Sequence, residues 1–185
     1  MSADPALAER AASAGSRRYL LIVLGVAAGV VLLDQLTKAW AVAVMLPRMQ
    51  TGGAGPIEVI GPFVRLTYAE NTGAAFSMGT GYTWIFTAIA VVVVVIILRL
   101  SRSLGSLGWA IALGGLLGGS LGNLIDRLTR PPGPGSGYVV DFIAFPNFPV
   151  FNVADSAITC SAILMVVLSM RGIDYRGGVR ATPRG

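Results

Sequence analysis

Residues Tyr82 to Leu98 read YTWIFTAIAVVVVVIIL and contain no charged side chain. At a rise of 1.5 Å per residue, a helix of about 17 to 22 residues matches the roughly 30 Å hydrocarbon core of a bilayer. Because lipid offers no hydrogen-bond partner, the backbone of such a run must pair within its own segment, as a helix does. This stretch therefore predicts a transmembrane helix.

Three further apolar runs also predict transmembrane helices, and the overall composition agrees. The chain has 185 residues, of which 54% are hydrophobic and 12% are charged, whereas soluble domains carry about 25% charged residues. Its mean hydropathy is +0.72. This composition leaves too little polar surface for a water-soluble globule. We therefore predict an all-α membrane protein, a bundle of four transmembrane helices at about residues 19–40, 82–98, 104–125 and 150–170.

The arginines indicate how the bundle is oriented. Nine of the thirteen lie in three segments: residues 1–18, the connection between the second and third spans, and residues 171–185. An even number of spans puts all three on one side, which the positive-inside rule identifies as the cytoplasm. We therefore expect cytoplasmic N- and C-terminal tails and two outer connections, residues 41–81 and 126–149. Most of the acidic residues lie at that outer side, so we expect the chemistry there.

The first outer connection also predicts strands. Val64, Leu66 and Tyr68 alternate with polar positions, which is typical of short strands with one apolar face. A small sheet at the membrane surface is the expected result. In the third span, Gly114, Gly118 and Gly122 recur every fourth residue, a spacing that lets a neighbouring helix approach closely.

Composition excludes several classes of function. The net charge is +5, but the basic residues lie at the ends of apolar runs and form no stripe, which argues against nucleic-acid binding. The chain contains no His, so Ser-His and Cys-His catalysis and most zinc sites are excluded. The single Cys160 lies in an apolar run, and we interpret it as a packing residue.

Ionisable side chains inside membrane spans are costly, so they are usually paired and often functional. Asp34 and Lys38 are four residues apart at the outer end of the first span, on one helical face. A helix-end salt bridge explains them; an indirect role in holding a site together is the alternative. Asn123, Asp126 and Arg127 share a face at the end of the third span. We interpret them as residues that orient a substrate or brace a site, with an interfacial anchor as the alternative.

Asp141 and Asp155 are the main candidates for chemistry. Asp141 lies among apolar residues just outside the membrane, and Asn152 and Asp155 open the fourth span. Helix capping explains Asn152 but fits Asp155 poorly, because three further residues place Asp155 about 4.5 Å deeper. Two close carboxyl groups in a low-dielectric site share one proton, so one can activate water while the other protonates a carbonyl oxygen. The pair predicts aspartic hydrolysis of an amide, without metal or cofactor.

Five short segments strengthen this interpretation. They are residues 33–38 (LDQLTK), 70–77 (ENTGAAFS), 118–127 (GGSLGNLIDR), 139–142 (VVDF) and 151–157 (FNVADSA). In this order, they resemble the lipoprotein signal peptidase (signal peptidase II) family. The loop Pro131–Gly137 is enlarged relative to the common pattern, and Ala144 and the stretch Phe145–Pro149 also depart from it.

The resemblance implies an aspartic endopeptidase of the bacterial plasma (inner) membrane. Such an enzyme removes the signal peptide from diacylglyceryl-modified prolipoproteins, cutting just before the lipidated Cys of the substrate. The implied fold is a four-helix bundle with a small extracytoplasmic β-cradle. By motif position, Asp141 and Asp155 would be catalytic. The implied substrate-binding residues are Asn71, Asn123, Arg127 and Asn152, and the implied supporting residues are Asp34, Lys38 and Asp126.

The expected partners are lipid-modified prolipoproteins and membrane lipids, and we expect a monomer that binds no nucleic acid and no metal. A small transporter or proton-coupled channel is the main alternative, because buried Asp, Asn and Arg also mark ion pathways. The sequence shows no inverted repeat, and its acids gather at one face, which argues against transport. A non-catalytic scaffold would leave Asp141 and Asp155 unexplained.

Overall fold

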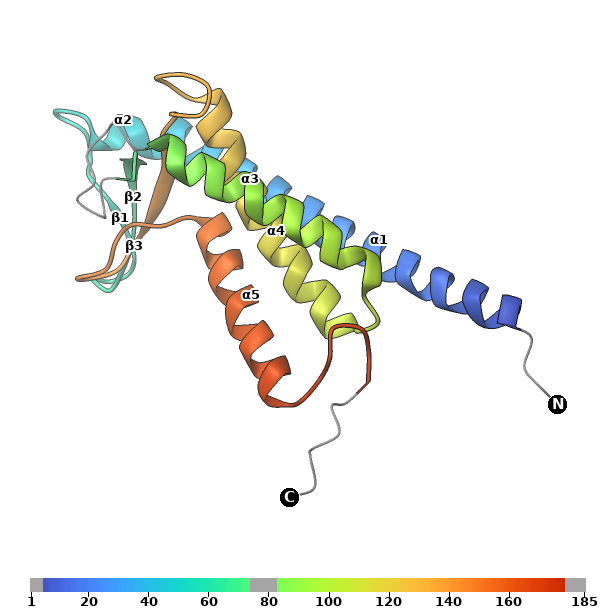
Figure 1. Cartoon of the computed structure of the whole chain (residues 1–185). Coiled ribbons are helices and arrows are strands. Elements are labelled where there is room, and N and C mark those ends of the chain that lie inside the picture. The colour runs from blue at the N-terminus through green and yellow to red at the C-terminus, as the bar shows by residue number, and fades with distance from the viewer. Residues whose placement is uncertain (1–4, 74–82, 179–185) are drawn as a thin grey trace.

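Helix α4 (Leu107–Thr129) lies at the centre of the molecule, in contact with the three other long helices (Figure 1). These are α1 (Pro5–Trp40), α3 (Thr83–Leu100) and α5 (Val153–Met170). The computed structural model describes residues 5–73 and 83–178. In its most apolar stretch α4 is 61% buried, against 11–17% for the other three helices. The core of the bundle is therefore built around α4.

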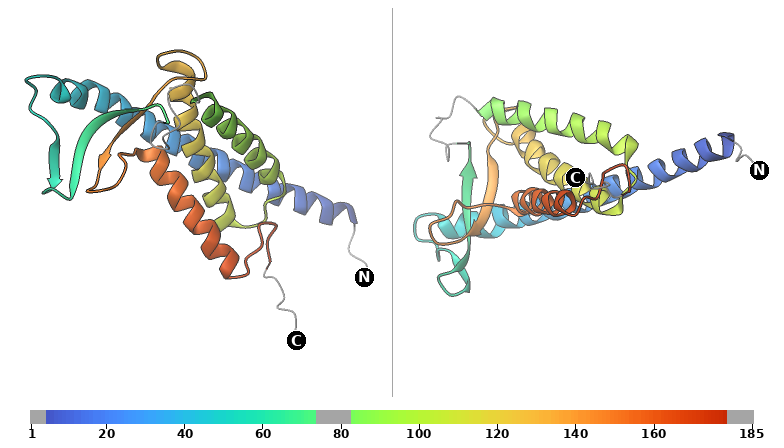
Figure 2. Two further views of the ribbon diagram at one scale, coloured as in Figure 1. Left: turned by 60° about the vertical axis from the view of Figure 1, so that its left-hand side comes forward. Right: turned by 60° about the horizontal axis from the view of Figure 1, so that its bottom comes forward.

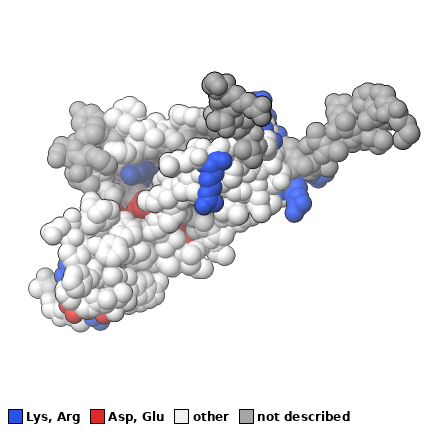
Figure 3. Space-filling view, turned by 90° about the horizontal axis from the view of Figure 1, so that it is seen from below, with Lys and Arg blue, Asp and Glu red and all other residues white. Residues whose placement is uncertain are grey.

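The predicted four-helix membrane fold is confirmed. Four helical segments are long and apolar enough to cross a bilayer: Arg17–Met49, Thr83–Ser103, Leu107–Thr129 and Val153–Met170. Seen from below, most of the visible surface carries no charged side chain (Figure 3). Leu, Ile and Val side chains on α1, α3 and α5 are largely exposed, as expected for helices that face lipid.

Glycines of α4 let its neighbours approach closely. A Cβ atom added at Gly118 would lie 2.8 Å from the carbonyl oxygen of Ala27 in α1. One added at Gly119 would lie 2.5 Å from the carbonyl oxygen of Ala154 in α5. Successive glycines of α4 thus make room for two different helices, α1 and α5. The close packing expected from the sequence is present on both sides of α4.

The first helix is longer than the sequence predicted. It begins at Pro5, within the expected N-terminal tail. Beyond Trp40 it continues through a π-helical segment, η1 (Ala41–Met45), and a last turn, α2 (Leu46–Met49), so the outer connection does not begin at residue 41. Ala41 is buried against Val140 and Phe142, and this packing holds the chain helical past its apolar run.

Other boundaries also differ from the expected ones. Helix α3 ends in a 3₁₀ turn, η4 (Ser101–Ser103), and α4 continues past residue 125. Helix α5 begins at Val153 because the side chain of Asn152 caps it there. Part of the expected C-terminal tail packs onto the α3–α4 connection, where the amide N of Gly105 donates 2.9 Å to the carbonyl oxygen of Tyr175. Residues 74–82, which include the second half of the 70–77 segment, lie outside the described residues.

A small antiparallel sheet lies at the end of the bundle where α3 and α5 begin (Figures 1 and 2). Its strands are β1 (Ile57–Ile60), β2 (Val64–Asn71) and β3 (Val139–Ala144), in the order β1-β2-β3. The strands predicted in the first connection are confirmed, whereas β3, from the second connection, was not predicted. Because β3 carries Asp141, its pairing with β2 positions the candidate site.

Candidate active site

Asp141 lies within β3, beside the end of β2. In the register of these strands Ala69 pairs with Asp141 and Asn71 with Val139, so Asn71 is a diagonal neighbour of Asp141. Nδ2 of Asn71 donates a 2.9 Å hydrogen bond to Oδ2 of Asp141. Nδ2 of Asn152 donates a 2.6 Å hydrogen bond to Oδ1 of the same carboxyl. Neutral amides therefore contact both oxygens.

The environment of Asp141 favours its protonated form. Its side chain is only 2% exposed. Burial raises the pKa of Asp141 most strongly, and the negative charge of Asp155 raises it further, to about 7. Hydrogen bonds from Asn71 and Asn152 lower the pKa but do not cancel this rise. Desolvation of this kind penalises the charged carboxylate more than the neutral acid. Asp141 can therefore hold a proton near neutral pH.

Asp155 is the third residue of α5 and helps to start that helix. Oδ1 of Asn152 accepts from the Asp155 amide at 2.9 Å, and Oδ2 of Asp155 accepts from the Asn152 amide at 3.3 Å. This is a capping box. The expectation that capping fits Asp155 poorly was wrong, because a carboxylate at the third position reaches back to the cap. Its other oxygen accepts a 2.8 Å hydrogen bond from Nδ2 of Asn123 in α4.

Asn152 connects the two acids. Its side chain donates to Asp141 and accepts from the backbone of Asp155, and it is fully buried. Each of the four carboxyl oxygens of the pair thus has a neutral N–H donor. Asp141 is buried and Asp155 partly buried, and the charge of Asp155 acts on Asp141. Two acids held in this way favour a state in which the pair keeps one proton.

A separate ionic cluster lies behind the pair. Nζ of Lys38 contacts Oδ2 of Asp34 at 2.8 Å and Oδ2 of Asp126 at 3.0 Å, and all three side chains are at most 1% exposed. Its third hydrogen bond goes to Oδ1 of Asn123, 2.9 Å away. Oδ1 of Asp34 accepts from the Ala154 amide at 2.9 Å, next to Asp155 in the chain. The cluster thereby fixes α1, α4 and the start of α5 together.

Two members of this cluster were missed by the sequence analysis. Nε2 of Gln35 donates to Asp34, to Asp126 and to the carbonyl oxygen of Gly122. Nε of Arg130 pairs with Oδ1 of Asp126 at 2.9 Å. The i, i+4 spacing of Asp126 and Arg130 was a usable signal. The role of Gln35 was not readable, because two of its three partners, Gly122 and Asp126, lie on a different helix.

Arg127 has a different environment from Arg130. It is 9% exposed, and its buried NH1 group has no hydrogen-bond partner among the described residues. Its positive charge interacts with Asp141, Asp155 and Asp126. A buried guanidinium with a spare donor can bind a carbonyl oxygen of a ligand.

The nine residues singled out in the sequence therefore come together at the sheet end of the bundle. A cavity of about 260 Å³ opens at this place, lined by residues 69–72 of β2 and its continuation, by Asp141, and by Pro149 and Val150. Within residues 17–73 and 83–178, no group of three or more His, Cys, Asp or Glu side chains has the arrangement of a metal site. The arrangement offers a carboxyl pair beside a cavity, with amide and guanidinium donors around it.

Comparisons with known proteins point to one family. Residues 26–171 match the family model described as Signal peptidase (SPase) II. The lipoprotein signal peptidase of Streptomyces coelicolor is 50% identical over 163 residues, which cover 88% of this chain and 77% of that protein. The lipoprotein signal peptidase of Mycobacterium avium is 49% identical over 158 residues, covering 85% and 84%.

Solved structures agree with the sequence relatives. Two solved structures of bacterial membrane enzymes, determined by the in meso method, are similar in fold. One has a TM-score of 0.69 at 30% identity, covering 80% of this chain and 92% of its own. The other has a TM-score of 0.66 at 31% identity, covering 80% and 87%.

Proposed function

The chain belongs to the signal peptidase II family and removes signal peptides from prolipoproteins, and we propose that Asp141 and Asp155 perform this cleavage as an aspartic pair. The observation that carries the proposal is the link through Asn152, which binds both acids at the edge of a cavity. The arrangement requires no metal and no cofactor for hydrolysis.

The chemistry needs one proton shared by the two acids. The ionised carboxylate accepts a proton from water, and the resulting hydroxide attacks the scissile carbonyl carbon. The protonated carboxyl donates to the carbonyl oxygen, which becomes a neutral hydroxyl in the tetrahedral intermediate. Collapse of the intermediate breaks the C–N bond: one of its two hydroxyls returns a proton to the pair as the carbonyl re-forms, and the departing nitrogen takes a proton from the pair, which is left with one proton as at the start. The raised pKa of Asp141 supports this state near neutral pH.

The polar residues around the pair hold the substrate backbone. Asn71 lies on the cavity wall, and its Nδ2 already orients Asp141. The NH1 group of Arg127, which has no partner within the described part of the chain, is available to a peptide carbonyl. Asn123 and Asn152 keep Asp155 in place. An extended signal peptide could therefore bind with its carbonyls towards Arg127 while its side chains enter the cavity.

The substrate is a prolipoprotein whose Cys carries a diacylglyceryl group, and the cut falls just before that Cys. Both the apolar signal peptide and the acyl chains partition into lipid, so lateral diffusion delivers them to a site at membrane depth. The protein acts as a monomer, with both termini in the cytoplasm and the site at the extracytoplasmic surface. The arginines near the ends of α1, α3 and α5 support this orientation.

Purified protein in liposomes should shorten a diacylglyceryl-modified prolipoprotein, with the new N-terminus at the lipidated Cys, as read by mass spectrometry. Asp141→Asn and Asp155→Asn should each lower the rate by about 10³-fold or more, because general acid and base catalysis are both lost. Helical content and membrane insertion should stay unchanged.

Asp174→Asn supplies the matched control, because Asp174 lies beyond α5, at the opposite end of the bundle. That variant should cleave at the normal rate. Near-normal cleavage by either Asp141→Asn or Asp155→Asn would exclude the aspartic mechanism. Equal cleavage of a prolipoprotein without its diacylglyceryl group would exclude the proposed substrate requirement.

A further inference from the structure

The first turns of α3 contact three separate parts of the site end. Thr83, Phe86 and Thr87 are spaced i, i+3 and i+4 and so share one face of the helix. Oγ1 of Thr83 donates 2.8 Å to the carbonyl oxygen of Thr72, just after β2. Oγ1 of Thr87 donates 2.7 Å to the carbonyl oxygen of Gly135, in the enlarged loop before β3. Between these two contacts, Phe86 reaches α4.

The ring of Phe86 lies under the guanidinium of Arg127. The central carbon of that guanidinium is 5.3 Å from the ring centroid, within the range of a cation–π interaction. On the side of β2, Gly73 adopts φ +88°, and a Cβ added there would lie 2.6 Å from the ring. A glycine at the end of the β2 segment therefore makes room for Phe86, in addition to permitting the turn.

An aromatic partner has a different consequence for Arg127 than a carboxylate would have. A carboxylate takes up two N–H donors of a guanidinium and neutralises its charge. An aromatic face attracts the flat cation through its π electrons and leaves the N–H donors at the edge available. This agrees with the buried NH1 of Arg127, for which residues 17–73 and 83–178 provide no hydrogen-bond partner. It also leaves the positive charge free to act on Asp141 and Asp155.

We infer that Phe86 is a positioning residue of the peptidase site: it holds Arg127 through a cation–π contact, so that the free N–H group is presented to the substrate backbone. This inference rests on the proposed function, in which Arg127 binds a peptide carbonyl. Gly73 and the two threonine contacts fix the ring, so α3 takes part in the site although most of its surface faces outward.

Replacement of Phe86 by fluorinated phenylalanines tests the inference in the full-length protein. Each added fluorine withdraws electron density from the ring face and weakens its attraction for a cation, with little change in shape. Across mono-, di- and trifluorophenylalanine, kcat/KM for the lipidated prolipoprotein should fall stepwise, by about 10-fold in total. 4-Methylphenylalanine, which is bulkier but keeps the negative ring face, should stay within about twofold of the unmodified protein.

The same fluorinated series at Phe63, an exposed residue of the β1–β2 turn, is the matched control and should have no effect. The inference would be overturned if kcat/KM stayed constant across the fluorinated series at Phe86, or if its decrease followed the size of the substituent. In that case cleavage by the unmodified protein would still support the proposed function. If the unmodified protein does not cleave the lipidated substrate, the proposed function itself fails.

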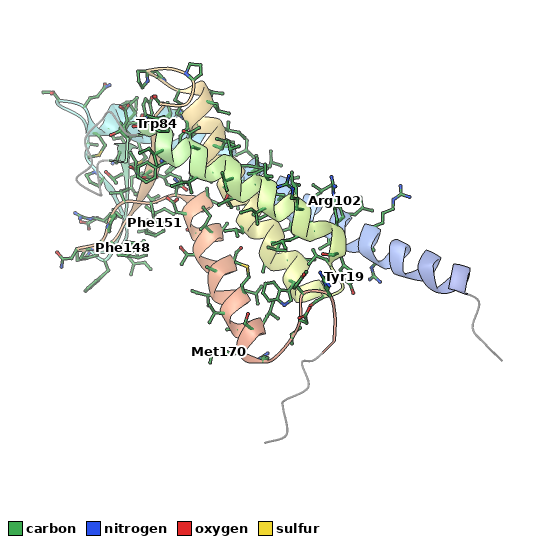
Figure 4. All side chains as sticks on the ribbon, in the orientation of Figure 1. Tyr19, Trp84, Arg102, Phe148, Phe151 and Met170 are labelled. Carbon is green, nitrogen blue, oxygen red and sulfur yellow. The ribbon has the colours of Figure 1, made fainter. Side chains whose placement is uncertain are left out.

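The position of α3 can be followed in Figure 4. Trp84, in the same turns of the helix, lies at the sheet end of the bundle, whereas Arg102 lies at the opposite end. Trp84 is 57% exposed, so it points away from the site that Phe86 contacts. Trp84→Leu should therefore leave kcat/KM within about twofold of the unmodified value, because surface substitutions rarely have larger effects.

Discussion

Two groups of acids lie at the same end of this bundle, and they are held in different ways. Asp34 and Asp126 share the ammonium of Lys38, at 2.8 and 3.0 Å. Asp141 and Asp155 accept hydrogen bonds only from asparagine amides and one backbone N–H among their contacts in the described chain. The first group is ion-paired, and the second is held by neutral donors.

The difference separates a structural role from a chemical one. Asp34 and Asp126 share one buried cation, which offsets the cost of burying their charges. A neutral amide satisfies an oxygen but stabilises the ionised form less strongly. The amide-held pair can therefore gain and lose a proton, which acid–base catalysis requires. Asn123 belongs to both groups, because it accepts from Lys38 and donates to Asp155.

The largest expected effect comes from removing the cation. Lys38→Met would leave two buried carboxylates without their shared partner, and we expect a loss of about 3 to 5 kcal/mol in the free energy of unfolding. Unfolding in detergent, followed by helical content, would measure this loss. Replacing Asp34 and Asp126 by Asn in the same protein should recover much of it, because the uncompensated charges are then gone.

Arg99→Met provides the control for Lys38→Met, because it removes an exposed cation from the far end of α3. It should change the free energy of unfolding by no more than about 0.5 kcal/mol. If Lys38→Met were equally mild, the two acids would not depend on Lys38, and the distinction between the two groups would be lost.

The second effect is the pH dependence of stability caused by Asp141. Its pKa is about 7 in the folded protein and about 3.9 in an unfolded chain. The folded state therefore binds this proton more tightly. The stabilisation is fully present below about pH 4 and is lost as pH rises through about 7. Between pH 5 and pH 8 we expect a loss of about 2 to 3 kcal/mol from this group.

Asp141→Asn should remove this part of the pH dependence, since an amide does not titrate. Unfolding of both proteins at pH 5 and pH 8 would measure the difference. Parallel pH profiles for the original protein and the variant would show that Asp141 does not contribute to the pH dependence of stability.

The smallest expected effect concerns the edge of the ionic cluster. Arg130 is 20% exposed at its side chain and pairs with Asp126, which also keeps Lys38 and the Val140 amide as partners. Arg130→Gln should therefore cost only about 0.5 to 1 kcal/mol in the free energy of unfolding. Cleavage should stay within about twofold. A loss as large as that of Lys38→Met would mean that Arg130, not Lys38, neutralises the cluster.

The sequence predicted much of the fold, and it identified the residues that the structure gathers at the candidate site. The four helices could be predicted because each apolar run is a continuous, local feature. Asp141 and Asp155 stood out because they are acids in apolar surroundings. Strand β3 was missed because Tyr138 to Phe142 also fits a loop, and its pairing partner in β2 is some 70 residues away in the sequence. The contact of Phe86 with Arg127 was missed because an apolar residue in an apolar run gives no local signal of a partner on another helix.

The sequence by itself determined that this chain enters a membrane and which polar side chains are present at the ends of its spans, because hydrophobic length is matched to bilayer thickness one segment at a time. The i, i+4 spacing already indicated that Asp34 pairs with Lys38, but only the tertiary structure decided that Asp126 shares this cation and that Asp141 and Asp155 receive amides. That choice depends on the β2–β3 register, on the cap of α5 and on the close approach of α1 and α5 to α4. Each of these brings together atoms from distant parts of the chain, and no local pattern records their distances.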